Sequence, residues 1–243
     1  MKQTLFITGT DTGVGKTVLT ALLTRFLRER GVNAAALKPV CSGGRADARA
    51  LHAAMDGTLT LDEINPWHFR APIAPLLAAR REKRSVKLSQ ALAHVRTMQR
   101  RFDVVLVEGA GGLLSPLGVC SGGLRPSQSS ALTERRYKES FDSRDLITAL
   151  RATPIIVAPN KLGVVNQILL TLEALPPAAA KQARVVLMSP PKPGAASKTN
   201  LNLLAEFLNA NRIFSLPWLG KRFDATEALK NPRVKRTLKG LID

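Results

Sequence analysis

Short aliphatic runs alternate along the chain with segments in which apolar residues recur every three or four positions. The first run, Leu5 to Ile7, precedes a helical pattern over 16–30 that Gly31 ends. Four consecutive aliphatic residues at 104–107 predict a strand that is buried on both faces. Further strands are predicted at 33–38, 154–158, 184–188 and 213–217, and further helices at 45–55, 88–101, 142–151, 197–211 and 225–241, with one more that ends at 175.

This order of about six or seven strands with intervening helices predicts an α/β fold with a doubly wound, mostly parallel sheet and helices on both faces. The whole chain, 1–243, is interpreted as one such domain. Residues 58–84 contain three prolines and are predicted to form an irregular connection. Residues 119–140 lack any apolar period and are rich in serine, glycine and charged residues, which predicts a flexible inserted loop.

A glycine-rich segment, Gly9-Thr-Asp-Thr-Gly-Val-Gly-Lys-Thr17, joins the first strand to the first helix. Glycines at 13 and 15 allow backbone N–H groups to converge on a phosphate, Lys16 can reach the outer phosphates, and the Thr17 hydroxyl can bind Mg²⁺. The G-x-x-x-x-G-K-S/T pattern is incomplete because Thr10 occupies its first glycine position. The strand before the loop and the helix after it still predict a nucleoside triphosphate site of the P-loop NTPase type.

Two later strand ends carry polar residues toward the same edge of the predicted sheet. Lys38 and Ser42 follow the second strand, Asp47 lies on the next predicted helix, and Glu108 ends the strand at 104–107. Ligands of open α/β sheets bind at the carboxyl ends of the strands, so these residues are expected to face the phosphates and the metal ion. Taken singly, Lys38 could equally be a solvated lysine, and Glu108 a buried carboxylate with a structural partner.

The composition adds one unusual feature, a formal net charge of +18 in a chain with an ordinary 45% hydrophobic content. Such a charge raises the possibility of a nucleic-acid partner. One tyrosine and two tryptophans make a poor stacking surface for bases, so solvated basic faces on an enzyme are favoured. Two cysteines without metal-ligand spacing, and no apolar run long enough to span a bilayer, favour a cytoplasmic protein that has no membrane partner.

With these motifs in place, the chain resembles the dethiobiotin synthetase family, ATP-dependent ligases of biotin synthesis. The likeness covers most of the sequence. It includes GTDTGVGKT, KPVCSGG after the second strand, Asn65-Pro66-Trp67, VLVEGAGG, NKLGVVN and LPWL, which occur here in the family's order. KPV-x-SG together with VEGAGG is more specific than the phosphate loop, which related amidating enzymes and partitioning ATPases share.

The resemblance implies a reaction in which 7,8-diaminononanoate, CO₂ and ATP give dethiobiotin, ADP and phosphate, through a carbamate that is then phosphorylated. It implies ATP, or another nucleoside triphosphate, and Mg²⁺ as cofactors. The implied catalytic residues are Thr12, Lys16, Lys38 and Ser42, and the implied metal ligands are Thr17, Asp47 and Glu108.

The family also implies contacts beyond the reacting groups. Nucleotide contacts are expected at Gly13, Val14, Gly15, Lys16, Thr17, Val18, Glu108, Gly109, Ala110, Gly111, Gly112, Pro217, Trp218 and Leu219. The substrate carboxylate is expected to be held across a homodimer interface by the neighbouring chain's Gly163, Val164, Val165 and Asn166.

Three departures from the family pattern affect the expected site. Some members carry glutamate where this chain has Gly13, and a tyrosine that helps to hold the substrate carboxylate aligns near Asn200. An Asn-Asp pair that reads adenine is replaced by Ser189 and Pro190 after Met188. The sequence therefore predicts weak selection of the nucleobase.

Two other classes of function stay open at this stage. A partitioning-type, nucleotide-switched ATPase would carry a second lysine near the start of the loop, where this chain has Asp11. A basic, nucleic-acid-associated ATPase is suggested only by the charge.

Overall fold

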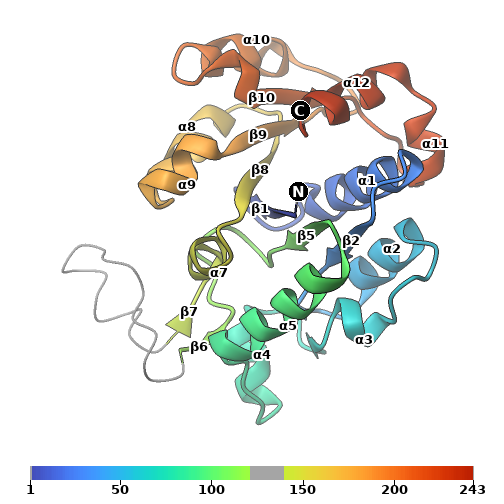
Figure 1. Ribbon diagram of the computed structural model, residues 1–243. Helices are drawn as coiled ribbons and strands as arrows, with labels where there is room; N and C mark the ends of the chain where they lie inside the picture. Colours follow the sequence, from blue (N-terminus) through green and yellow to red (C-terminus); the bar gives the residue numbers. More distant parts are fainter. Residues whose placement is uncertain (1, 121–139, 243) are drawn as a thin grey trace.

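A six-stranded sheet, all of whose strands run parallel, forms the centre of the computed structural model, which describes residues 2–120 and 140–242 (Figure 1). The strand order is β10-β9-β8-β1-β5-β2. The strands are β1 (Gln3–Gly9), β2 (Ala34–Leu37), β5 (Val104–Glu108), β8 (Thr153–Pro159), β9 (Arg184–Met188) and β10 (Ile213–Leu216). The predicted doubly wound, parallel α/β fold is confirmed.

The helices cover both faces of this sheet (Figure 1). α1 (Lys16–Glu29) packs on β1, β2 and β5, and it is flanked by α2 (Ala46–Ala54), α11 (Ala225–Leu229) and α12 (Pro232–Gly240). α5 (Leu88–Arg101) and α7 (Ser143–Leu150) pack on each other and against β5 and β1. Further along the sheet, α8 (Val164–Glu173) and α9 (Pro177–Gln182) contact β8, and α10 (Ala195–Ala205) contacts β10.

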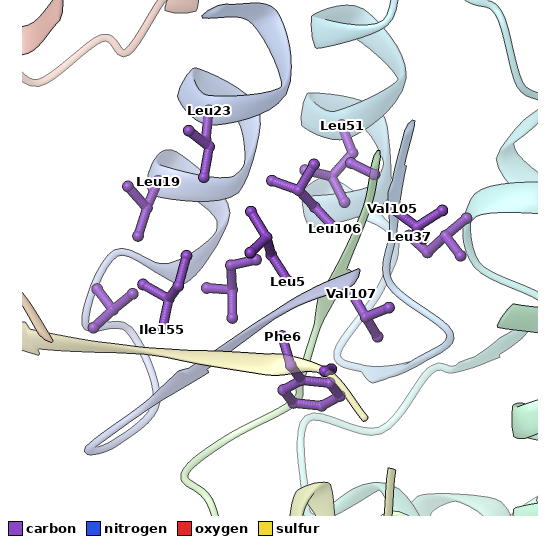
Figure 2. Close-up of a cluster of buried hydrophobic side chains, with 14 of the residues drawn as sticks. Leu5, Phe6, Leu19, Leu23, Leu37, Leu51, Val105, Leu106, Val107 and Ile155 are labelled. Atoms are coloured by element: carbon purple, nitrogen blue, oxygen red, sulfur yellow. The ribbon is translucent and has the colours of Figure 1, made fainter. Parts of the chain in front are cut away.

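The core lies around β1, whose aliphatic run is buried on both faces. Leu5, Phe6 and Ile7 are 0% exposed. Alternate residues of a strand point to opposite faces, so Leu5 points toward the face covered by α1 while Phe6 points to the other face (Figure 2). Each such side chain stabilises the fold by about 1.5–3 kcal/mol on burial. The end of β1, from which the glycine-rich loop emerges, is therefore firmly anchored.

The segment 58–84 is more regular than predicted. It contains α3 (Leu61–Ile64), β4 (Trp67–Phe69) and α4 (Pro75–Arg81). Thr60 and Glu63 form a reciprocal cap at the start of α3, and Pro75 occupies the first turn of α4. The prediction of an irregular connection was wrong because these elements are too short to show an apolar period.

The second strand, predicted at 33–38, is followed after Pro39 by a short strand that was not predicted. β2 ends at Leu37 within the central sheet, and β3 (Val40–Ser42) pairs in parallel with β4 in a separate two-stranded sheet. The chain therefore leaves the central sheet at Lys38, one of the four candidate catalytic residues.

Three predicted helix boundaries need correction. The helix predicted to end at 175 ends at Glu173 and is followed by α9, and the helix predicted at 197–211 runs from Ala195 to Ala205 with a 3₁₀ turn, η1 (Ala210–Arg212), after it. The helix predicted at 225–241 is two helices, because the Asn231 side chain caps a new helix that begins at Pro232.

The segment predicted as a flexible loop, 119–140, lies mostly outside the described residues. Of its two ends, Val119 belongs to β6 (Gly118–Val119) and Ser140 to β7 (Ser140–Phe141), and these two short strands pair in antiparallel fashion. Among the helices that the structure describes, none has the length and apolar character needed to cross a membrane.

Candidate nucleotide-binding and catalytic site

The glycine-rich loop turns sharply between β1 and α1. Gly13 and Gly15 have φ angles of 74° and 101°, a conformation that residues with a Cβ adopt only with strain. A Cβ on Gly15 would also lie 3.0 Å from the Met188 side chain. Gly15 precedes α1 and no side chain caps the helix, so the N–H groups of its first turn are free to bind an anion.

Four side chains meet behind this loop. The Lys38 ammonium lies 2.6 Å from Asp47 Oδ2 and 2.6 Å from Glu108 Oε1. The Thr17 hydroxyl donates a 2.7 Å hydrogen bond to the same Glu108 oxygen. Lys38 is 4% exposed and Glu108 is 1% exposed. A buried cation is thus held between two carboxylates, one from β5 and one from α2.

Lys16 lies near this group but has a different environment. Its ammonium donates a 2.7 Å hydrogen bond to the carbonyl oxygen of Asp11 within the loop. Burial, followed by the positive charge of Lys38, lowers the pKa of Lys16 to about 8. Lys16 is therefore protonated at neutral pH and loses its proton in the mildly alkaline range.

For Lys38 and Asp47, the attraction between opposite charges outweighs the effect of burial on the pKa. Burial opposes the charge on Lys38, yet the carboxylates of Glu108 and Asp47 outweigh it and raise the pKa of Lys38 above its ordinary value. Burial also opposes the charge on Asp47, but the ammonium of Lys38 outweighs it and lowers the pKa of Asp47. Both groups are consequently ionised across the physiological range.

The oxygen atoms at this point suit a magnesium ion. Thr17, Asp47 and Glu108 provide a hydroxyl and two carboxylates, the hard donors that Mg²⁺ prefers. Glu108 Oε2 is buried and has no hydrogen-bond partner in the described structure. Since an unpartnered buried carboxylate oxygen is costly, a cation at this oxygen fits the residues present.

A cavity of about 640 Å³ opens beside these groups, a size typical of small-molecule sites. Most residues predicted from the loop and from the strand ends line it. They are Thr12, Gly13, Gly15, Lys16, Thr17, Val18, Lys38, Ser42, Asp47, Glu108, Ala110 and Gly111. Residues far apart in sequence are therefore brought together at the carboxyl edge of the sheet.

The remaining loop and strand-end residues lie near this cavity without lining it. Val14 is buried, and its side chain would meet a Cβ placed on Gly9. Gly109 packs closely against Phe6. Gly112 lines an adjacent cavity of about 530 Å³ instead.

The residues predicted to hold the substrate across a dimer follow the carboxyl end of β8. Gly163 has a φ of 85° and precedes α8, which begins at Val164. Val164 is 0% exposed, so its side chain packs in the core and only its backbone can face a ligand. The adjacent cavity is lined by later residues of α8, among them Gln167 and Leu170. The 640 Å³ cavity of the same chain is not lined by any residue of the predicted substrate loop, 163–166.

Pro217, Trp218 and Leu219 follow the carboxyl end of β10, one of the two edge strands of the sheet. Trp218 is 49% exposed. None of the three lines the 640 Å³ cavity.

Asn200 has a structural environment that the sequence did not reveal. It is 6% exposed, and its side-chain amide donates to Asn160 Oδ1 at 2.8 Å and to the Lys161 carbonyl at 3.0 Å. The Asn160 amide in turn donates to the Ser197 carbonyl at 2.9 Å. Asn200 thus holds the loop that leads into Gly163.

Several residues that line the cavity were not predicted from the sequence. Pro72, Ile73, Ala74 and Pro75 form one wall, and Ser115 accepts a 3.0 Å hydrogen bond from the Gly112 N–H. The proline-rich composition was the available signal, but it was interpreted only as a sign of irregular backbone.

The sequence profile of the AAA domain family matches residues 3–120, which include the loop, Lys38 and Glu108. Two solved structures share the fold at low sequence identity. They are pNOB8 ParA bound to nonspecific DNA, with a TM-score of 0.55 at 11% identity, and the MinC:MinD cell division protein complex of Aquifex aeolicus, with 0.57 at 15%. Their alignments cover 100% and 99% of this chain, and 98% and 96% of theirs. The fold and the loop define a P-loop nucleotide-binding protein.

Similarity to curated proteins is more specific. The chain is 43% identical over 175 residues to the ATP-dependent dethiobiotin synthetase BioD of Anaeromyxobacter sp. (strain Fw109-5), covering 70% of each chain. It is 33% identical over 230 residues to the enzyme of the same name from Thermodesulfovibrio yellowstonii, covering 90% of each. The chain belongs to the ATP-dependent dethiobiotin synthetase family.

Proposed function

We propose that this protein is an ATP-dependent dethiobiotin synthetase, a ligase that converts 7,8-diaminononanoate, CO₂ and ATP to dethiobiotin, ADP and phosphate. The family relationship over most of the chain is the observation that carries this proposal. The convergence of Lys16 and Lys38 on one cavity supports it, because phosphoryl transfer depends mainly on positioned positive charge.

The chemistry needs a phosphorylated carbamate. One amine of the substrate adds to CO₂, and the carbamate oxygen so formed attacks the γ-phosphorus of ATP and displaces ADP. The second amine then attacks the carbamoyl carbon, phosphate leaves, and the ring closes as a cyclic urea. Lys16 and Lys38 line the cavity in which charge on the transferred group develops.

We assign the metal ligands to Thr17, Asp47 and Glu108. These three residues would hold a magnesium ion, which would neutralise part of the charge on the phosphates of ATP. The Lys38 ammonium bridges the Asp47 and Glu108 carboxylates, so it holds these two groups close to each other at the cavity that all three residues line. Thr12 and Ser42, which line the same cavity, are proposed to hold the carbamate or the phosphate.

We also propose that the enzyme is a homodimer in which Gly163 to Asn166 of one chain complete the substrate site of the other. Two exposed leucines that line the 530 Å³ cavity, and a third on the loop before α8, support an interface that includes these residues. Leu114 and Leu170 line that cavity and are 42% and 61% exposed, and Leu162 is 86% exposed.

A cytoplasmic location is proposed from the cysteines. Cys41 and Cys120 are both free thiols, as is usual in a reducing compartment.

Family membership does not favour the two other functions. The partitioning-type switch and the nucleic-acid-associated ATPase were suggested by the phosphate loop and by the net charge of +18. The similarity to pNOB8 ParA establishes a shared fold alone.

The decisive experiment incubates the purified protein with diaminononanoate, ¹³C-bicarbonate, Mg²⁺ and ATP and follows the products by mass spectrometry. The expected result is dethiobiotin that carries the label in its urea carbon, with one ADP formed per product. ATP hydrolysis that DNA stimulates, without labelled dethiobiotin, would overturn the proposal in favour of the nucleic-acid-associated ATPase.

A further inference from the structure

A buried asparagine outside the nucleotide cavity holds the backbone of Lys38. Asn65 is 0% exposed, and its side-chain amide donates a 2.6 Å hydrogen bond to the Lys38 carbonyl. The Lys38 N–H donates to the carbonyl of Ile64 at 2.9 Å. Both backbone polar groups of Lys38 are therefore bound by one neighbouring segment, at the point where the chain leaves the central sheet.

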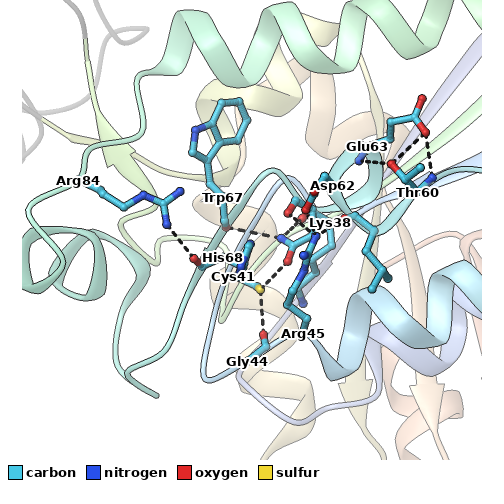
Figure 3. A network of polar contacts seen from close by, with 12 residues as sticks. Lys38, Cys41, Gly44, Arg45, Thr60, Asp62, Glu63, Trp67, His68 and Arg84 are labelled. Carbon is cyan, nitrogen blue, oxygen red and sulfur yellow. Dashed lines mark hydrogen bonds and ion pairs between the residues drawn. The ribbon is translucent and has the colours of Figure 1, made fainter.

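The same asparagine also binds the start of β3. The Cys41 thiol lies 3.1 Å from Asn65 Oδ1 and 3.1 Å from the Gly44 carbonyl oxygen, so Oδ1 is one of two acceptors that share its single proton (Figure 3). The side chain thus donates on one side and accepts on the other, and both partners belong to the segment that leads from the end of β2 into β3. An amide meets this demand, whereas a carboxylate only accepts and an aliphatic side chain does neither.

Arg45 connects Asn65 to the metal-binding carboxylate. Its guanidinium donates to the Asn65 carbonyl at 3.1 Å and to the Leu61 carbonyl, and it pairs with Asp62 at 2.8 Å (Figure 3). Arg45 is the residue from which α2 starts, and Asp47 lies in the first turn of that helix.

These contacts form a closed ring. Asn65 holds the Lys38 backbone, Arg45 holds the Asn65 backbone, and α2 carries Asp47 back to the Lys38 ammonium at 2.6 Å. The separation between the β2 end and the α2 start is therefore fixed from two sides. A shift of the β2 end would move the Lys38 ammonium, and a shift of the α2 start would move the Asp47 carboxylate.

We propose that Asn65 is a positioning residue for phosphoryl transfer, with Arg45 as its anchor. The inference rests on the proposed function. Asn65 does not line the cavity, so it acts only through the placement of Lys38 and Asp47. Displacing a reacting group by about 1 Å costs on the order of a hundredfold in rate, and this is the loss expected without the ring.

The test compares Asn65→Ala, Asn65→Asp and Arg45→Met with Asn33→Ala as the matched control. Asn33 also donates its side-chain amide to a backbone carbonyl, that of Arg101 at 3.0 Å, but it lies at the opposite, amino end of β2. For each folded variant, kcat and KM are measured for dethiobiotin formation. Calorimetry gives the ATP affinity with and without Mg²⁺.

Both Asn65 variants are expected to lose about a hundredfold in kcat and Arg45→Met about tenfold, with KM for the diamine changed by less than about threefold. The gain in ATP affinity on adding Mg²⁺ should shrink at least about fivefold in Asn65→Ala. A purely structural asparagine would instead lower the melting temperature and leave kcat per folded molecule unchanged, and that result overturns the proposal.

Two further outcomes remain decisive. If Asn65→Ala does not fold, Arg45→Met decides, because the Arg45 side chain is 18% exposed and this variant keeps the Asn65 side chain itself. If neither the unsubstituted protein nor Asn33→Ala makes dethiobiotin, the proposed function fails. The Mg²⁺ effect on ATP affinity then decides the role of Asn65, and an unchanged effect in the Asn65 variants rejects it.

Discussion

At the scale of single residues, Lys38 is a buried cation that lies between the two carboxylates of the site. Its ammonium contacts both Asp47 and Glu108 at 2.6 Å. In a low-dielectric site, an oriented cation of this kind stabilises developing negative charge far more than it would in water. Its removal also leaves two carboxylates facing each other without a cation between them.

Lys38→Ala is therefore expected to reduce kcat by about a hundredfold or more, equivalent to about 3–4 kcal/mol of transition-state stabilisation. Lys16→Ala should have a comparable effect. The control is Lys181→Ala, because Lys181 is an exposed residue of α9. Steady-state turnover with circular dichroism as a check on folding measures the effect. Near-normal turnover of folded Lys38→Ala would contradict the assigned role.

The lowered pKa of Lys16 predicts how nucleotide binding depends on pH. With a pKa of about 8, roughly nine in ten Lys16 side chains are protonated at pH 7 and about one in ten at pH 9. Because a lowered pKa means that the cation is lost as the pH rises, affinity for ATP should fall about tenfold between these values. Lys16→Arg, which keeps its charge, should show a flatter profile. Calorimetric titrations at each pH measure both, and parallel profiles would contradict the prediction.

At the scale of elements, the turn between β8 and α8 depends on α10. Asn200 of α10 donates to Asn160 and to the Lys161 carbonyl, and it thereby fixes the loop that precedes Gly163. Asn200 thus holds the proposed carboxylate-binding loop in place through hydrogen bonds from α10. It occupies the position near which some family members are expected to have a tyrosine.

Asn200→Ala should therefore raise KM for diaminononanoate by about tenfold while kcat stays nearly unchanged, since two buried hydrogen bonds that order the loop are lost. Asn202→Ala, an exposed neighbour on the same helix, serves as the control. A fall in kcat without a change in KM would assign Asn200 to a different role.

The end of β9 is the segment at which the family resemblance leads us to expect contacts with the nucleobase. Met188 packs against Gly15 of the phosphate loop, and the Ser189 N–H is already bound to the Leu216 carbonyl at 2.9 Å. Pro190 and Pro191 have no N–H to donate. This segment therefore offers no amide side chain that could pair with adenine.

We expect CTP, GTP and UTP to support turnover within about tenfold of ATP in kcat/KM, because a missing pair of base contacts removes about 1–3 kcal/mol of discrimination. All four triphosphates are compared in one assay. Preference for ATP above about a hundredfold would show that other groups, such as the backbone at 217–219, read the base.

At the scale of the whole molecule, the proposed dimer makes a clear prediction about Leu170. This side chain is 61% exposed and lines the 530 Å³ cavity beside the phosphate loop. A charge placed there would be buried in the interface without a partner.

Leu170→Asp is expected to convert the dimer to a monomer and to abolish most turnover, since the substrate loop of the partner would be lost. Phe207→Asp is the control, because Phe207 is similarly exposed at 58% but follows α10. Sedimentation and turnover are measured together. A monomeric unsubstituted protein with full activity would exclude the dimer.

The sequence by itself determined the parts of the protein that local chemistry specifies. Periodicity and aliphatic runs predicted the six central strands, and the residues from Gly9 to Thr17 could be interpreted as a phosphate loop because glycine spacing, lysine and threonine act within one turn of backbone. The strand β4 was missed because its three residues carry too little periodic signal, and the division between α11 and α12 was missed because the Asn231 side-chain cap creates it.

Only the tertiary structure decided which residues meet. Lys38, Asp47 and Glu108 come from a strand end, a helix and another strand, and their contacts depend on the order in which β2, β5 and β1 pair. The support from Asn65 likewise needs the return of the chain through α3 to β4. Side-chain identity sets what each group can donate or accept, but distances of 2.6 Å arise from packing among segments up to 70 residues apart.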